Sequence, residues 1–168
     1  YTIEVAASYT GYFGAYSLVL SSSGTDDFGD TTTAATTVTL GAGGRAATQL
    51  AHEHDMMAVA VTAGHIYTAT CTTTASYLCA FIVRNDAGTQ VTTTSYGTST
   101  TATFVAAASG TYTFDMSPAS STTGSWTFRV ADSGTDDFGD TPATAGTGTV
   151  GTPVNGNLQY AGDKDVVS

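Results

Sequence analysis

An identical nine-residue string occurs twice in this chain, and it constrains the architecture more than any other feature. SGTDDFGDT occupies residues 23–31 and again residues 133–141. Downstream of the string, residues 31–57 align without a gap with residues 141–167. The repeat period of about 110 residues is the size of one ordinary domain, so the sequence predicts one domain per repeat.

The two ends of the chain fall out of phase with this period. Upstream of the string, residues 1–20 line up with residues 112–130. Small polar stretches at residues 21–24 and 131–134 are expected to be short linkers between repeats. We therefore expect three parts: residues 1–22 as the C-terminal strands of a preceding repeat, residues 23–131 as a complete repeat, and residues 132–168 as the N-terminal part of a following repeat.

The terminal segments carry apolar residues at alternating positions, such as Ile3 and Val5, and Tyr16, Leu18 and Leu20. Without the rest of their repeats, they would expose apolar area and unpaired strand edges. We expect them to pair with neighbouring subunits or flanking repeats by strand addition. The two segments together lack the middle strands of a repeat, so a head-to-tail exchange does not rebuild a whole domain. Either the contact adds a strand to an existing sheet edge, or the true chain is longer.

The charge balance narrows the range of partners. The chain has 14 acidic and 4 basic side chains, for a net charge of −10. Nucleic acids and anionic lipid surfaces need a basic face, so the sequence predicts neither as a partner and favours cations. No apolar run reaches the roughly 18 residues of a membrane span, and no signal peptide lies in this window, so we expect no membrane insertion. Polarity supplied by Ser and Thr hydroxyls suits a secreted protein, which predicts an extracellular or cell-surface location.

The hydrophobic pattern is β throughout. Short runs rich in Val, Ile, Tyr, Phe and Thr alternate with clusters of Gly, Asp, Asn and Ser. In residues 56–62 and 125–130, apolar side chains recur at every second position, which places them on one face of a strand. The predicted fold class is all-β, a jelly-roll-like antiparallel β-sandwich of about eight strands per repeat. The expected strands are residues 1–5, 15–20, 37–40, 56–62, 66–71, 77–83, 101–107, 110–116 and 125–130.

Cys71 and Cys79 lie in consecutive predicted strands, on either side of a short turn. Facing positions on such a hairpin approach disulfide distance, so a disulfide is the favoured interpretation. A buried pair of free thiols is the alternative. A metal site at the cysteines is disfavoured because the second ligand pair of a zinc site is missing.

Six motifs follow one another between residues 26 and 130: DDFGDT, EHDMMAVAV, TAGHIYTAT, FIVRNDAGTQ, ASGTYTFDM and GSWTFRV. In this order they resemble the bacterial pre-peptidase C-terminal (PPC) domain family, here in tandem repeat. Through that family they also resemble the collagen-binding domains of secreted clostridial collagenases. The resemblance implies a jelly-roll β-sandwich on a secreted protein, a domain that accompanies another activity and is not itself catalytic. The collagen-contacting aromatic residues have no counterpart here, so collagen binding is not implied.

In the calcium-binding members of that family, acids of the opening segment share a Ca²⁺ ion with a later acid-x-acid step. The resemblance therefore implies Ca²⁺ as a cofactor. The first acid of the step differs between the copies, Glu53 in one and Asp163 in the other, which departs from the family's pattern. The implied ligands are Asp26, Asp27, Asp30, Glu53 and Asp55 in the complete repeat, and Asp136, Asp137, Asp140, Asp163 and Asp165 in the partial copy.

The residues themselves leave two interpretations of DDFGD open. Three carboxylates within five residues repel one another unless a cation intervenes, and Ca²⁺ binds about six to eight hard oxygens. Asp and Gly also make good turns, so the string can simply start a strand. His52 and His54 are expected to be surface histidines and not a transition-metal site, because the partial copy has Gly162 and Lys164 at those positions.

The sequence contains no nucleophile elbow, so an enzyme is not expected. The favoured function is an extracellular structural or adhesive β-sandwich repeat, stabilised by Ca²⁺, from a surface filament, fibre or large adhesin. Such a repeat would assemble through strand or edge contacts between repeats or subunits. The alternative is a non-catalytic accessory or binding domain of a secreted hydrolase of the protease type. Expected partners are neighbouring copies or flanking repeats, with a polysaccharide or host surface as a further candidate.

Overall fold

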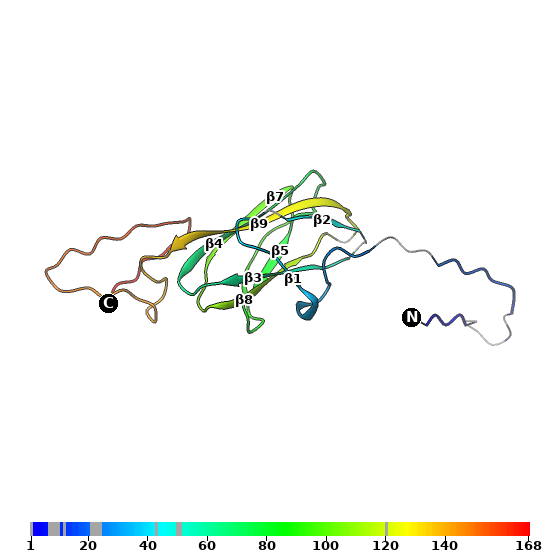
Figure 1. Cartoon of the computed structure of the whole chain (residues 1–168), viewed down its shortest axis with the longest axis horizontal. Helices are drawn as coiled ribbons and strands as arrows, with labels where there is room; N and C mark the ends of the chain where they lie inside the picture. Colours follow the sequence, from blue (N-terminus) through cyan, green and yellow to red (C-terminus); the bar gives the residue numbers. More distant parts are fainter. Residues whose placement is uncertain are drawn as a thin grey trace.

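A computed structural model describes residues 2–6, 11, 13–20, 25–42, 44–49, 52–119 and 121–168 of the chain. Its centre is a sandwich of two β-sheets (Figure 1). Among the described residues, no helical segment has the length and apolarity that crossing a bilayer requires. The elements are η1 (Thr32–Ala34), a short 3-10 helix, and the strands β1 (Thr36–Thr37), β2 (Gly44–Thr48), β3 (Asp55–Val61), β4 (His65–Thr73), β5 (Phe81–Arg84), β6 (Gln90–Thr93), β7 (Ser99–Val105), β8 (Gly110–Met116) and β9 (Gly124–Thr135).

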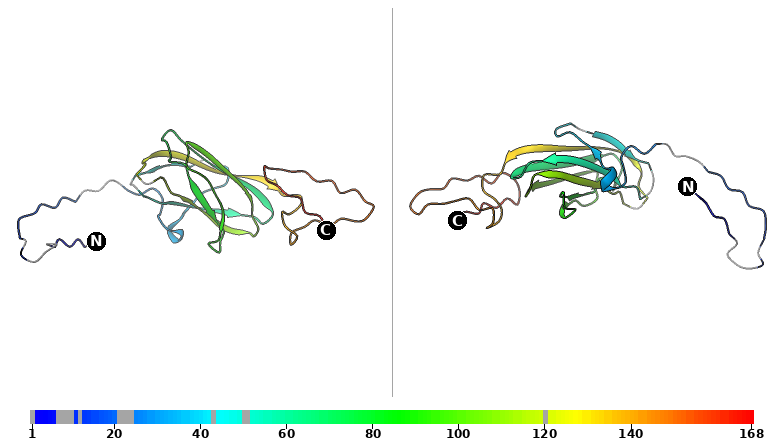
Figure 2. Two further views of the ribbon diagram at one scale, coloured as in Figure 1. Left: turned by 180° about the vertical axis from the view of Figure 1, so that it is seen from behind. Right: turned by 60° about the horizontal axis from the view of Figure 1, so that its bottom comes forward.

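The strands form a five-stranded sheet in the order β1-β3-β8-β5-β6 and a four-stranded sheet in the order β2-β9-β4-β7. Neighbouring strands pair antiparallel, except that β1 pairs parallel with β3. Figure 2 shows the sandwich from two further sides. The predicted all-β sandwich is therefore confirmed, with one short parallel pair that the sequence pattern did not indicate.

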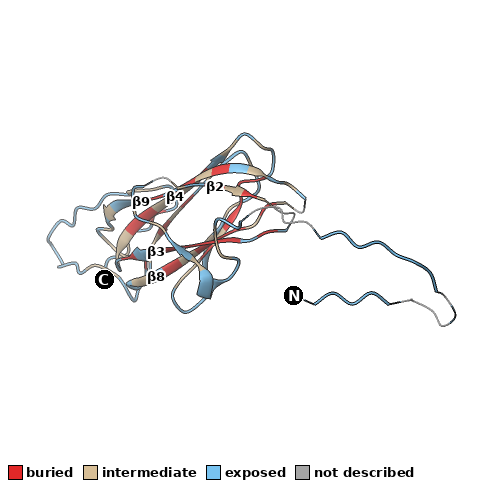
Figure 3. Cartoon of the chain, turned by 45° about the vertical axis from the view of Figure 1, so that its right-hand side comes forward, coloured by how far each residue is buried: buried red, intermediate tan, exposed pale blue. Residues whose placement is uncertain are grey.

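Alternation along the strands places apolar side chains between the two sheets. Met57 of β3 and Trp126 and Phe128 of β9 are buried, as their spacing predicts. Figure 3 shows buried residues along both of these strands. The rings of Phe81 and Phe114 both pack against Phe128, with centroids 5.5 Å and 5.3 Å away. Burying a side chain of this size stabilises the fold by roughly 1.5–3 kcal/mol, so this aromatic cluster is a main source of stability.

Two strands were not predicted from the sequence. Strand β2 reads GRAAT and β6 reads QVTT, and neither contains the apolar run that marks a buried strand. Both lie at the edge of a sheet. An edge strand has one neighbour and a largely exposed face, so it needs few apolar side chains and leaves a weak signal in the sequence.

The N-terminal segment does not form the two strands that were predicted for it. The described parts of these runs, residues 2–5 and 15–20, contain no strand, and residues 21–24 lie outside the described residues. Ile3 and Leu18 are about half exposed, at 51% and 53%. A strand needs a hydrogen-bonding partner, and Figure 1 shows this segment extending away from the sandwich.

Strand β9 continues across the expected domain boundary between residues 131 and 132. It runs to Thr135 and pairs with β4 along most of its length, from Trp126 opposite Thr73 to Thr135 opposite His65. The next residue, Asp136, donates its backbone N–H to the Gly64 carbonyl at 2.9 Å. Residues 131–134 therefore belong to a strand of the sandwich and do not form the separate linker that their composition predicts.

The predicted disulfide between Cys71 and Cys79 is present, with the Cα atoms 5.6 Å apart. Its setting differs from the expected hairpin. Cys71 lies in β4 of the four-stranded sheet, whereas Cys79 lies two residues before β5 of the five-stranded sheet. The bond therefore ties the two sheets together where the chain crosses between them, and both cysteines are fully buried.

Reducing this disulfide should destabilise the sandwich. The cysteines are 8 residues apart, and opening so short a loop increases the entropy of the unfolded chain by an amount worth about 2.5 kcal/mol. Chemical denaturation of the oxidised and reduced chains should show this difference in the free energy of unfolding. Two titratable thiols in the native, unreduced protein would contradict the assignment.

Candidate metal centre

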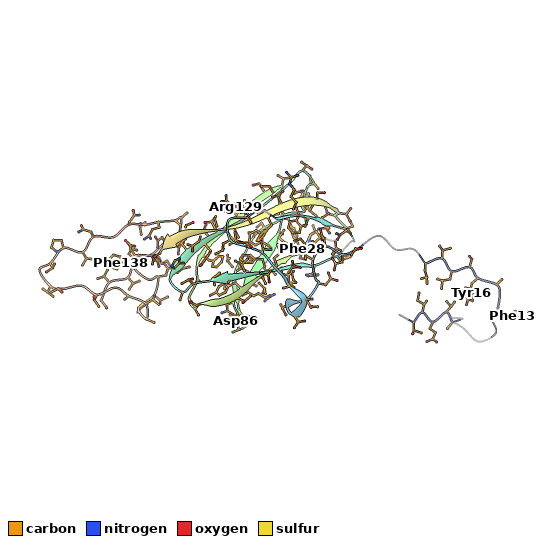
Figure 4. All side chains as sticks on the ribbon, viewed as in Figure 1. Phe13, Tyr16, Phe28, Asp86, Arg129 and Phe138 are labelled. Carbon is orange, nitrogen blue, oxygen red and sulfur yellow. A yellow bond between two sulfur atoms is a disulfide. The ribbon has the colours of Figure 1, made fainter. Side chains whose placement is uncertain are left out.

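The first acidic loop, residues 25–31, owes its shape to the two residues at its middle. Phe28 stacks on Trp126 of the core with ring centroids 5.8 Å apart, which anchors the loop to the sandwich. Gly29 lies so close to Ala34 that an added Cβ would collide with the Ala34 carbonyl oxygen. The Gly29 carbonyl accepts the Met56 N–H at 3.0 Å, so the loop is fixed against the start of β3. Figure 4 labels Phe28 in this position.

This docking brings three of the predicted ligands together. Asp26, Asp27 and Asp55 each offer a carboxylate oxygen within 4.8 Å of the others. Asp26 and Asp27 are exposed, whereas Asp55, the first residue of β3, is fully buried. Neither carboxylate oxygen of Asp55 has a hydrogen-bond partner among the described residues. An ionised carboxylate in that position is costly unless a positive charge lies beside it.

The electrostatics of the metal-free cluster agree with this geometry. Burial, followed by the nearby carboxylates of Asp27, Glu53, Asp26 and Asp30, raises the pKa of Asp55 to about 8. The cluster therefore retains a proton at pH values where an ordinary aspartate is ionised. A bound cation would replace that proton.

A second cluster lies 110 residues further along the chain. Asp136, Asp163 and Asp165 each offer an oxygen within 4.8 Å of the others. One carboxylate oxygen of each is buried without a hydrogen-bond partner in the described part of the chain. Burial, reinforced by the Asp163 carboxylate, raises the pKa of Asp136 to about 6. The same causes of shift therefore operate in both clusters.

The backbone of the first acidic loop is also repeated at this interval. Phe138 and Gly139 occupy the places of Phe28 and Gly29, and an added Cβ at Gly139 would collide with Thr144. Three hydrogen bonds of the first copy recur in the second. Ala34 N–H to Thr31 O (3.0 Å) recurs as Thr144 N–H to Thr141 O (2.9 Å), and Met56 N–H to Gly29 O (3.0 Å) recurs as Val166 N–H to Gly139 O (3.3 Å). Ala47 N–H to Asp27 Oδ2 (2.9 Å) recurs as Asn157 N–H to Asp137 Oδ2 (2.8 Å). The parallel pair Thr36–Met57 likewise recurs as Gly146–Val167.

Four predicted ligands lie outside the two tight clusters. Glu53 accepts a hydrogen bond from the Gln49 backbone N–H, and its carboxylate remains close enough to raise the pKa of Asp55. The charge of Asp30 also contributes to the raised pKa of Asp55. In the second copy, Asp137 accepts the Gln159 side-chain amide at 2.6 Å, and Asp140 accepts the Tyr160 hydroxyl at 2.9 Å.

Sequence reasoning missed a pair of amide oxygens. The side-chain Oε1 atoms of Gln49 and Gln159 are buried and have no hydrogen-bond partner among the described residues. The two glutamines are 110 residues apart and precede the acid-x-acid step by the same interval in each copy. Both aligned copies have glutamine at this position, and this identity is the sequence signal that could have revealed the two amide oxygens.

The histidines beside the first cluster do not join it. Within the described residues, neither group of potential metal ligands contains a histidine. His54 is 45% exposed at its side chain and hydrogen bonds through Nδ1 to Asp115 at 2.7 Å. His52 is exposed and has φ +65°, an uncommon value for a residue other than glycine.

No protein-family model matches the chain, and no curated protein matches it either. Several solved structures are similar to it, including the following two. One is the pre-peptidase C-terminal domain of collagenase from Bacillus anthracis, with 13% identity, coverage of 57% of this chain and 93% of that chain, and a TM-score of 0.47. The other is PliG from Aeromonas hydrophila, a periplasmic inhibitor of g-type lysozyme, with 14% identity, 58% and 96% coverage, and a TM-score of 0.47. Likenesses at this level assign neither family nor function, so the PPC resemblance stays a prediction.

The donor atoms at both clusters fit a hard divalent cation. Calcium binds carboxylate and amide oxygens at about 2.3–2.6 Å, so two of its ligands lie at most about 5 Å apart. The oxygens of each cluster lie within 4.8 Å of one another, which meets that condition. Neutralising several carboxylates at once also removes the repulsion that raises the pKa of Asp55.

The metal-free protein should lose stability as the pH rises from about 4 to about 8. The pKa of Asp55 is about 8 in the folded chain and 3.8 in its ordinary state, so the folded chain binds more protons within this window. The contribution of Asp55 to stability is therefore fully present below the lower value and is lost progressively until the upper value is passed. Denaturant unfolding of the metal-free chain should show this slope, and Asp55→Asn should flatten it. A slope that the substitution does not change would contradict the assignment of Asp55.

Proposed function

We propose that this chain is an extracellular structural β-sandwich repeat whose two carboxylate clusters each bind Ca²⁺. Asp26, Asp27 and Asp55, with the amide oxygen of Gln49, would hold one ion. Asp136, Asp163 and Asp165, with Gln159, would hold the other. Each ion would fix an acidic loop to the acid-x-acid step of its repeat, which in the complete repeat leads into β3.

The observation that carries the proposal is the state of Asp55. Its carboxylate is fully buried, and both oxygens lack a hydrogen-bond partner among the described residues. A loop that serves only as a turn has no need to surround a buried acid with further acids. A cation accounts for the burial, the missing partners and the convergence of like charges together.

The structural role is supported by how the two sites are connected. Strand β9 leaves the core of the sandwich at Val130 and reaches Thr135, the residue before Asp136 of the second cluster. Consecutive sites are thus joined through a strand paired with β4, and an ion at the second site would order the chain beyond it. The acids of the two clusters are assigned here as ligands, and the proposed role is non-catalytic.

The extracellular location is proposed from the disulfide and the ion. A buried bond between Cys71 and Cys79 persists in oxidising compartments, and Ca²⁺ is abundant outside cells. The proposed partners are neighbouring copies or flanking repeats in a surface filament, fibre or large adhesin, with a polysaccharide or host surface as a further candidate. The alternative, an accessory domain of a secreted hydrolase, remains a prediction from the sequence resemblance.

Calcium titration of the metal-free chain should give a stoichiometry of two ions per chain. Asp55→Asn and Asp165→Asn should each reduce it to one, because each removes a ligand of one cluster. Asp86→Asn is the matched control, since Asp86 lies in an exposed turn outside both clusters and should leave the stoichiometry at two. Isothermal titration calorimetry provides the measurement.

Calcium should also stabilise the sandwich by mass action. An ion present at 100 times its Kd stabilises a site that only the folded chain forms by about 2.7 kcal/mol. The melting temperature should therefore rise with Ca²⁺ in the wild type and in Asp86→Asn, and the rise should be smaller in Asp55→Asn, which keeps one site. Identical melting in chelator and in millimolar Ca²⁺ would mean that DDFGD serves only as a turn.

A further inference from the structure

We propose that the N-terminal segment of one chain docks on the C-terminal segment of a second copy and forms there the strand pairings that the complete repeat forms within itself. The docking segment consists of residues 2–5 and 14–20, and its receptor consists of residues 136–168. The inference rests on the proposed structural role and adds to it which segments meet and in which register.

The docking segment has the side chains of two core strands but exposes them. By alignment, Ile3 takes the place of Phe114 in β8, and Leu18 takes the place of Phe128 in β9. Phe114 and Phe128 are fully buried, whereas Ile3 and Leu18 are 51% and 53% exposed. Val19 aligns with the exposed Arg129, so the outward face matches as well. The segment therefore has the side-chain pattern of two core strands, and the described residues do not cover it.

The receptor exposes the complementary positions. Val154 and Leu158 align with the two ends of β2, and Val167 aligns with the fully buried Met57 of β3. The exposed fractions of Val154, Leu158 and Val167 are 44%, 66% and 43%. Figure 3 shows both terminal segments with few buried residues, in contrast to the strands of the sandwich.

The register of docking follows from the pairs observed in the complete repeat. Met57 pairs with Phe114 between β3 and β8, and Gly44 pairs with Phe128 between β2 and β9. When each residue of these pairs is replaced by its counterpart in the repeat alignment, Ile3 of one chain lies opposite Val167 of the other. Leu18 likewise lies opposite Val154. Both pairings are antiparallel, as in the complete repeat.

The strands brought together in this way are neighbours in both sheets. The receptor supplies the equivalents of β1, β2 and β3, and the docking segment supplies those of β8 and β9. The sheet orders β1-β3-β8 and β2-β9 are each contiguous in the complete repeat. The product is a half-sandwich and not a whole domain, so it does not need the equivalents of the middle strands β4 to β7.

An aromatic contact of the complete repeat has a counterpart at this interface. Phe28 stacks on Trp126 at 5.8 Å, and the aligned pair is Phe138 of the receptor and Tyr16 of the docking segment. Tyr16 is 70% exposed in the single chain. Figure 4 shows Tyr16 and Phe138 beyond opposite ends of the sandwich. Contact between opposite ends of two copies is heterologous, so repetition produces an open filament.

Cysteine cross-linking between two differently labelled copies of the 168-residue chain tests the register. Ile3→Cys is mixed with Val167→Cys carrying ¹⁵N, and mixed disulfide dimers are counted by mass after mild oxidation. Both positions are exposed, so neither change threatens folding. Successive side chains of a strand point to opposite faces, so the yield of mixed dimer should clearly exceed that from Thr2→Cys with Val167→Cys. Equal yields from the two mixtures, or no mixed dimer, would overturn the proposal.

Self-association of the wild type and of two neighbouring variants provides a second measurement. Leu18→Asp places a charge on the face that docks and should abolish assembly in sedimentation velocity. Val19→Asp places it on the opposite face and should leave assembly unchanged, since Val19 is 84% exposed and aligns with an outward residue. Equal effects of the two variants would overturn the docking register. Cross-linking is measured with and without Ca²⁺, so a failure of the calcium sites is distinguished from a failure of docking.

Discussion

The buried carboxylate of Asp55 is the constraint around which one end of the sandwich is organised. It begins β3, is fully buried and has no hydrogen-bond partner among the described residues. Asp26 and Asp27 approach it because Phe28 packs on the core and Gly29 allows a close backbone contact. A charge in this position requires either a proton or a cation, so the stability of this end is linked to both.

The chain contains the same loop in two different settings. Around the first cluster, β8 and β9 complete the sheets, and Phe28 stacks on Trp126. Around the second cluster, the loop hydrogen bonds are kept, although Phe138 packs over Gly146 and Gly156 instead of a core aromatic ring. The loop geometry is thus encoded by nearby residues, whereas the side chains that pack over the loop come from strands distant in the sequence, such as β9. This difference is why the terminal segments matter for assembly.

Strand β9 links the two settings mechanically. Its first half lies over the core, and its last residues pair with the start of β4 before the second acidic loop begins. A hydrogen bond between His65 and Asp132, with Nδ1 and Oδ2 3.0 Å apart, lies at this same junction. A strand that belongs to one repeat and leads into the ion site of the next resists bending better than a linker of small residues.

The sequence by itself determined the strand faces, the disulfide pair and the set of acids. Period-2 alternation at Met57 or Phe128 is a local property of a strand, and it survives in any sandwich. Only the tertiary structure decided which acids converge, because Asp55 and the acidic loop meet through the docking of distant residues, while Asp140 turns to Tyr160. It also decided that the amide oxygen of Gln49 is buried, that edge strands β2 and β6 exist, and that the disulfide joins two sheets. These features depend on contacts between segments far apart in the chain, which no local pattern records.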